Sequence, residues 1–179
     1  MWLINTHNGI KEKGINSVNI NDYPAIKNHL DKYYTELKKR QDKGNTIYNL
    51  RNCAYMDDFF KQKIVWGNLC LNAQYALVEE QYFINAPSTM IVPGNKFLLA
   101  VLNSPISDFY IRTLGVTRNG GYFEYKPMFV EKIPVFYPAI EVKSAIENLV
   151  DLQNYDKINK LIYDVYELSS EEVNFIETQ

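Results

Sequence analysis

Three short apolar runs between residues 61 and 93 constrain the fold more than any other feature. The first, IVW at residues 64–66, consists of side chains that favour strands and ends at a glycine. The second covers residues 74–87 and is rich in aromatic side chains, and the third covers residues 90–93. Polar connectors separate these runs, so we expect several short strands here and not the alternation of strands and crossover helices of a parallel sheet.

Helical patterns flank this strand-rich region. Residues 22–43 carry apolar side chains at steps of three and four, with Asp22 as the expected N-cap and a proline in the first turn. Residues 96–102 are apolar and helical. Ser104 and Pro105 then have the order of an N-cap and a first helical residue, which predicts a second helix directly afterwards. Strands and helices in this arrangement indicate an α+β fold.

The two ends of the chain show different patterns. Residues 1–21 have no helical period, and their glycine-containing turn between two short apolar segments predicts two strands. Residues 139–179 carry two apolar helical stripes separated by a turn at residues 154–156, which predicts an α-hairpin. Ser169 and Glu172 form a capping box that predicts the start of a short last helix.

Charge is also distributed unevenly along the chain. The net charge of the 179 residues is −2. Residues 139–179 contain three basic and nine acidic side chains, a net charge of −6, which leaves residues 1–138 with a net charge of +4. We therefore expect two parts, a strand-rich body at residues 1–138 that is suited to an anionic partner and an acidic helical tail at residues 139–179.

Residues 117–135, TRNGGYFEYKPMFVEKIPV, combine chemistry that suits nucleic acid with a turn signal. The paired glycines at positions 120 and 121 tolerate positive φ and predict the turn of a β-hairpin. The basic, amide and aromatic side chains beside them can contact phosphates and base edges. An ordinary hairpin would have the same glycines. Residues 130–136 are expected to form an apolar strand.

The sequence contains no catalytic or metal-binding constellation. His7 and His29 are its two histidines, and neither has further ligands at metal-binding spacing. Glycine-rich phosphate loops and a nucleophile elbow are absent. No run reaches the roughly 18 apolar residues of a membrane span, and the start of the chain lacks a signal-peptide pattern. Cys53 and Cys70 are expected to be reduced thiols, which predicts a cytoplasmic location without membrane partners.

Six segments taken together resemble one family. They are THNG, DYPAIKNHL, LKKRQDKGNTIYNLRNCAY, KIVW, LLAVLNSPISDFY and NGGYFEYKPMFVEKIPV, in this order and spacing. The chain resembles the TaqI-like C-terminal specificity domain, the target recognition domain of type IIG restriction-modification enzymes and related adenine methyltransferases. The ending INKLIYDVYELSSEEVNFIE is similar to the ends of such enzymes.

The resemblance implies a double β-helix-like, strand-rich body with flanking helices and a C-terminal α-hairpin. It also implies that double-stranded DNA is the partner and that methyltransferase and nuclease domains of a parent protein do the chemistry. The Asn-Pro-Pro-Tyr type motif of the methyltransferase is missing from this sequence. We therefore expect a non-catalytic chain without cofactors, with S-adenosylmethionine and Mg²⁺ belonging to the other domains.

Family domains of this kind contact bases from variable loops, for which residues 67–81 and 117–126 are the candidates here. Asn72, Gln74 and Asn119 are expected to pair with adenine. Arg118 is expected to contact either a guanine or a phosphate. Tyr122 and Tyr125 are expected to donate hydrogen bonds to phosphates or to contact a thymine methyl. The residues expected to contact phosphates are Arg51, Lys63 and Lys126.

Two alternatives remain open at this point. The acidic helical tail could dock on another protein, which would make the chain a protein-interaction module. The Glu-x-Lys triplets at residues 36–38 and 141–143 could serve a metal-dependent nuclease, although both triplets lie in predicted helices. Salt-dependent DNA binding distinguishes the main hypothesis from the first alternative, and magnesium-dependent cleavage would support the second.

Overall fold

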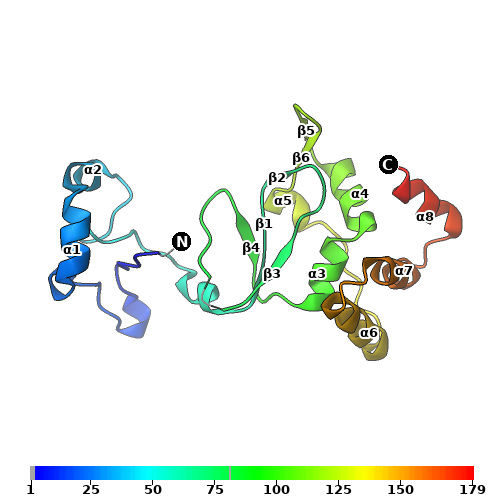
Figure 1. The fold of residues 1–179 in the computed structure, drawn as a ribbon, viewed down its shortest axis with the longest axis horizontal. Helices are drawn as coiled ribbons and strands as arrows, with labels where there is room; N and C mark the ends of the chain where they lie inside the picture. Colours follow the sequence, from blue (N-terminus) through cyan, green and yellow to red (C-terminus); the bar gives the residue numbers. More distant parts are fainter. Residues whose placement is uncertain (1–2, 81) are drawn as a thin grey trace. The chain divides into compact units, whose positions relative to one another are not determined.

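The computed structural model describes residues 3–80 and 82–179 and divides the chain into two compact units (Figure 1). Unit 1 is Met1–Met56 and unit 2 is Asp57–Gln179. Helices and short antiparallel strands occur together, so the predicted α+β class is confirmed. The boundary predicted at residue 138 is a different division of the chain and stays a prediction.

Unit 1 contains two short helices where the sequence predicted one. They are α1 (Pro24–Asp31) and α2 (Tyr34–Lys39), preceded by the 3-10 turns η1 (Lys11–Lys13) and η2 (Ile20–Asp22). The break lies at Lys32 and Tyr33, where the backbone of Tyr33 leaves the helical conformation with φ −112° and ψ 21°. Aromatic residues such as Tyr33 are weak helix formers. Tyr23 occupies the N-cap position of α1, so the N-cap predicted at Asp22 was wrong.

The two strands predicted for residues 1–21 are not formed in the described part of that segment. The structure has an isolated bridge between Ile10 and Ile15, and residues 1 and 2 lie outside the described residues. Unit 1 is instead held together by buried polar groups. The Asn49 side chain is 1% exposed, and its amide donates to the carbonyl of Val18 at 2.9 Å and accepts from the hydroxyl of Thr46 at 2.6 Å.

Unit 2 contains a first antiparallel sheet with the order β3-β1-β4. Its strands are β1 (Lys63–Trp66), β3 (Ala76–Val78) and β4 (Thr89–Ile91), preceded by the 3-10 helix η3 (Met56–Phe60). Ile64 lies opposite Leu77 on one side and Ile91 on the other. All three predicted apolar runs therefore supply strands.

A second antiparallel sheet has the order β2-β6-β5. Its strands are β2 (Leu69–Cys70), β5 (Thr117–Arg118) and β6 (Tyr122–Glu124). The β5–β6 pair is the hairpin that the paired glycines predicted, and Figure 1 shows it projecting beside α4. The double β-helix arrangement is not established by these two small sheets and stays a prediction.

Two helices meet at a tight corner after the first sheet. They are α3 (Lys96–Leu102) and α4 (Pro105–Leu114). The Ser104 side chain accepts from the backbone N–H of Ser107, and Pro105 occupies the first helical position, so this helix start is confirmed. The strand predicted at residues 130–136 is wrong, because Pro127 begins the short helix α5 (Pro127–Val130) and Pro134 lacks the N–H that a strand would use.

The tail forms three helices. They are α6 (Ile140–Asp151), α7 (Tyr155–Val165) and α8 (Ser170–Glu177). The predicted α-hairpin and the capping box of Ser169 and Glu172 are both confirmed. None of the helices that the structure describes is both long and apolar enough to cross a bilayer.

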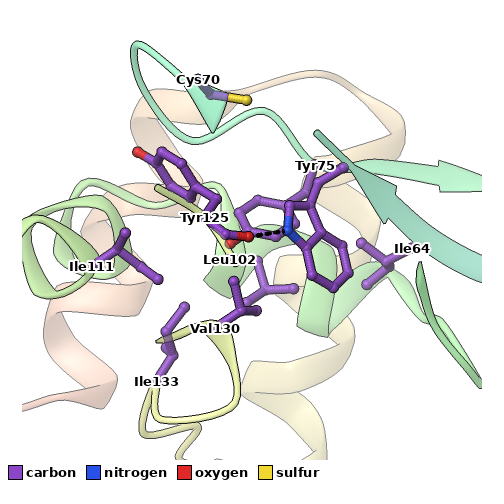
Figure 2. Packing of buried hydrophobic residues seen from close by; sticks show 9 residues of the cluster. Ile64, Cys70, Tyr75, Leu102, Ile111, Tyr125, Val130 and Ile133 are labelled. Carbon is purple, nitrogen blue, oxygen red and sulfur yellow. Dashed lines mark hydrogen bonds between the residues drawn. The ribbon is translucent and has the colours of Figure 1, made fainter. Parts of the chain in front are cut away.

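Two apolar clusters form the core of unit 2. The first contains Ile64, Trp66, Cys70, Tyr75, Leu102, Ile111, Tyr125, Val130 and Ile133 (Figure 2). Within it the Trp66 indole N–H donates to the carbonyl of Tyr125 at 2.6 Å, which ties β1 to the end of β6. The second cluster joins α3 to α6 and α7 and contains Phe97, Ala100, Val101, Ile146, Ile158 and Ile162.

Candidate nucleic-acid interface

The β2-β6-β5 sheet brings together two segments that are about 50 residues apart in the sequence. Leu69 lies opposite Glu124, and Cys70 lies opposite Phe123. The loop after β2 contains Asn72 and Gln74, which are both exposed. One sheet therefore carries both segments that the sequence proposed as base-contacting loops.

The β5–β6 hairpin presents a basic and an amide side chain at its turn. Arg118 and Asn119 are exposed, and Tyr122, opposite Arg118, is 39% exposed. Gly120 and Gly121 follow with φ values of +82° and +79°, a conformation that favours glycine. The turn thus leaves these polar side chains accessible to solvent.

Glu124 connects the basic residues of the hairpin. Its carboxylate accepts from Nε and Nη2 of Arg118 and, at 2.8 Å, from Nζ of Lys126. The Glu124 side chain is 7% exposed, whereas those of Arg118 and Lys126 are 54% and 44% exposed. Hydrogen bonds from Lys126 and Arg118 lower the pKa of Glu124, so this carboxylate is ionised at neutral pH.

The loop after β2 is held by side chains from the α3–α4 corner. Asn103 accepts from the backbone N–H of Tyr75 and donates to the carbonyl of Tyr75, both at 2.9 Å. Asp108 accepts from the N–H of Ala73 at 2.8 Å, and Arg112 donates to the carbonyl of Leu71 at 3.1 Å. The exposed loop therefore has a fixed backbone.

A hollow of about 530 Å³ lies beside the hairpin. It is lined by Asn68, Leu69, Thr117, Arg118, Asn119 and Glu124. Asn68 is a lining residue that sequence reasoning missed. Its side chain accepts from the hydroxyl of Thr89 at 2.7 Å, and its carbonyl accepts from the N–H of Tyr125. The pairing of β6 with both β2 and β5 brings Asn68 and Arg118 to the same hollow, and no local sequence pattern encodes the pairing of β2 with β6.

The family model described as the TaqI-like C-terminal specificity domain matches residues 10–135 of this chain. The chain belongs to the TaqI-like C-terminal specificity domain family. No curated protein matches it. The family is the one that the sequence segments resembled, and it gives the chain a DNA-recognition role in restriction-modification enzymes. Specificity domains are generally non-catalytic.

The part of the chain that matches the specificity-domain family contains the complete β2-β6-β5 sheet and the α3–α4 corner. The match ends before α6, so the helices of the tail lie outside it. The hollow and both exposed loops therefore belong to the region that defines a specificity domain.

Lys63 and Tyr125 were predicted to contact DNA, but both are buried in this specificity domain. The Lys63 side chain is fully buried; its Nζ donates to the carbonyl of Glu79 at 3.2 Å, and burial lowers its pKa. Tyr125 is 1% exposed and donates its hydroxyl to Asp108. Burial and this hydrogen bond raise the pKa of Tyr125. Neither side chain is accessible to a phosphate or a base, so we leave both out of the proposed interface.

Arg51 belongs to unit 1, whereas the sheet residues belong to unit 2. It is exposed and pairs with Asp42, with 3.4 Å between Nη1 and Oδ2. At this exposure such a pair is weak, and the guanidinium can exchange Asp42 for another anion. A phosphate contact by Arg51 stays a prediction.

The two Glu-x-Lys triplets lie on α2 and α6, as predicted. Within residues 3–80 and 82–179, no group of three or more His, Cys, Asp or Glu side chains is placed to hold a metal ion. The nuclease alternative thus gains no support from a specific observation.

Proposed function

We propose that this chain is the target recognition domain of a type IIG restriction enzyme or a related adenine methyltransferase. It would hold double-stranded DNA for methyltransferase and nuclease modules that lie outside this chain. S-adenosylmethionine and Mg²⁺ would be bound by those modules. This chain would supply contacts and no chemical step.

The observation that supports the proposal is the gathering of exposed polar side chains on one sheet of the family-matched region. Arg118 and Asn119 come from the hairpin, and Asn72 and Gln74 come from the loop beside β2. Guanidinium and amide groups form the paired hydrogen bonds that distinguish guanine and adenine in the major groove. Lys126, at the end of the hairpin, adds a positive charge suited to the DNA backbone.

Fluorescence anisotropy with labelled duplexes tests this function. We expect binding at low salt that weakens steeply as salt increases, because phosphate contacts release counterions. Arg118→Ala should weaken binding roughly tenfold, the effect of losing about 1.4 kcal/mol of contact energy. Asn16→Ala, an exposed change in unit 1, should leave binding unchanged. Absence of binding to any duplex at low salt would contradict the proposed function for this chain.

Exposed apolar side chains in the tail support a second candidate, docking on another protein module. Ile140, Leu152 and Tyr155 are 64%, 73% and 60% exposed, and they lie on an acidic segment outside the family match. Such residues are expected at a protein interface. Titrating the chain with a separately purified methyltransferase module, with Leu152→Asp as the variant, tests this candidate. If the variant binds as tightly as the original chain, docking through Leu152 is excluded.

A further inference from the structure

Glu124 and Arg118 are neighbours on one face of the β5–β6 hairpin. Arg118 lies opposite Tyr122, and side chains two residues apart on a strand point to the same face. Glu124 is therefore the diagonal neighbour of Arg118, within reach of a long side chain. The Glu124 side chain is nearly buried, while the Arg118 side chain is about half exposed. A fixed anion thus lies at the inner side of a solvent-accessible arginine.

The contacts determine which edge of the guanidinium is occupied. Glu124 accepts from Nε and from Nη2 of Arg118. This leaves the two hydrogens of Nη1 and the second hydrogen of Nη2. One N–H of Nη1 and the free N–H of Nη2 form the outer edge of the group. A guanidinium edge with two parallel N–H bonds matches the O6 and N7 acceptors of guanine. Holding the other edge reduces the conformational freedom that Arg118 would lose on binding.

The charge of Glu124 favours a base over a phosphate as the partner of Arg118. The carboxylate repels the negative charge of an approaching phosphate. The acceptors of a base carry no net charge, so this repulsion is absent when a base approaches. Lys126 balances part of the negative charge, so Arg118, Lys126 and Glu124 together carry a net positive charge. The group attracts DNA as a whole and directs Arg118 toward a base edge.

We propose that Arg118, positioned by Glu124, contacts a guanine in the recognised DNA sequence, and that Glu124 is the positioning residue that makes this contact selective. This inference rests on the proposed function and adds a base identity to it. The site is the hollow beside the hairpin, whose lining also includes the amide side chains of Asn68 and Asn119.

The test begins with selection from a pool of randomised duplexes by the complete 179-residue chain. We expect the selected duplexes to share a guanine, and Arg118→Ala to lose the preference at that position. Replacing this guanine by 7-deazaguanine removes the N7 acceptor, so it should weaken binding of the original chain roughly tenfold. The same replacement should leave binding by Arg118→Ala unchanged, because the contact is already lost.

Glu124→Gln separates positioning from a structural role. Removing the carboxylate should flatten the guanine preference while strengthening binding to an unrelated duplex, because two cations lose their anionic partner. Simple destabilisation would weaken both kinds of binding. Glu171→Gln removes the same charge from α8 and should leave the guanine preference intact. Arg118→Lys keeps the charge without the paired donors and should lose the preference while retaining non-specific binding.

The outcomes distinguish the inference from the proposed function. If the original chain binds no duplex, the proposed function fails, and this inference fails with it. If it selects a sequence whose guanine positions are insensitive to Arg118→Ala, the guanine contact is wrong and the recognition function stands. A guanine preference that survives in Glu124→Gln would show that Glu124 does not position Arg118.

Discussion

Unit 1 and unit 2 have interiors of opposite character. Among the described residues of unit 1, Ile20 is the one buried apolar side chain, and Thr6 and Asn49 are buried polar residues. Unit 2 contains two apolar clusters that draw on its sheets and on its helices. The β2-β6-β5 sheet is built directly on the first of these clusters through Cys70, Phe123 and Tyr125. The candidate interface therefore rests on the unit that buries more apolar surface.

This difference predicts that the two units lose stability in different ways. Burying apolar surface contributes roughly 25 cal/mol per Å² to the free energy of unfolding. The stability of unit 2 therefore comes from many small contributions spread over its two clusters. A hydrogen bond contributes only about 1 kcal/mol net, but a buried polar group left without its partner costs more than that. Unit 1 should therefore depend strongly on a few polar side chains.

Leu102→Ala should have the largest effect of the changes considered. The side chain is 2% exposed in the first cluster, and truncating a buried leucine costs about 2–5 kcal/mol. The expected result is faster native-state hydrogen exchange in β1 and at the β5–β6 hairpin. Leu152→Ala, at a side chain that is 73% exposed, should change stability by less than about 0.5 kcal/mol. Equal effects of the two changes would contradict the apolar core assigned to unit 2.

Asn49→Ala should lower the stability of unit 1 by about 1–3 kcal/mol, because it removes hydrogen bonds to Val18 and Thr46 inside the unit. The amides of Gly44 and Leu50, which donate to the carbonyls of Asn49 and Thr6, report this by faster exchange. Asn16→Ala is the exposed control. If β1 lost protection to the same extent, the two units would unfold together and the contrast between them would not hold.

Acid should produce the smallest effect, and its direction should be the same in both units. The pKa of Glu124 is lowered by Lys126 and Arg118, and the pKa of Asp31 in unit 1 is lowered by Tyr48 and Lys27. A carboxyl whose pKa is lowered on folding contributes stability that is present above its ordinary pKa and is lost as the pH falls through the folded-state value.

The acid effect is measured by comparing the unfolding free energy of the original chain with that of each amide variant as the pH falls. The difference in unfolding free energy between the original chain and Glu124→Gln should be constant above about pH 5.5 and should shrink as the pH falls below the ordinary value of 4.5. Asp31→Asn should behave likewise below 3.8. A difference that grows on acidification would contradict the assigned ion pairs.

Two helix starts with local capping signals were predicted correctly from the sequence, whereas the N-cap predicted at Asp22 was not. Ser104 and Pro105 specify the start of α4, and Ser169 with Glu172 specifies the start of α8, because capping uses residues only a few positions apart. The strand predicted at residues 130–136 was wrong because the prediction followed the apolar composition and gave too little weight to Pro127 and Pro134. The break between α1 and α2 was missed because the apolar stripe continues across it.

The candidate site was predicted only in part, for a related reason. The hairpin turn follows from adjacent glycines, so Arg118 and Asn119 were placed on it from the sequence. Burial of Lys63 depends on strand β1 lying between two others, and this requires knowledge of which distant segments pair. Glu124 is adjacent to predicted residues, yet its role appears only when both of its cationic partners are located.

The anchors of the loop after β2 have a consequence for changing what this domain recognises. Asn103, Asp108 and Arg112 hold the loop through its backbone N–H and carbonyl groups at residues 71, 73 and 75. These bonds do not use the side chains at positions 72 and 74. Both side chains are exposed, and the Gln74 amide donates to Oδ1 of Asn72 at 3.1 Å. New side chains can thus be introduced at these two positions while the hydrogen bonds to the loop backbone stay the same. This makes the loop a suitable place to change the DNA sequence that the domain recognises.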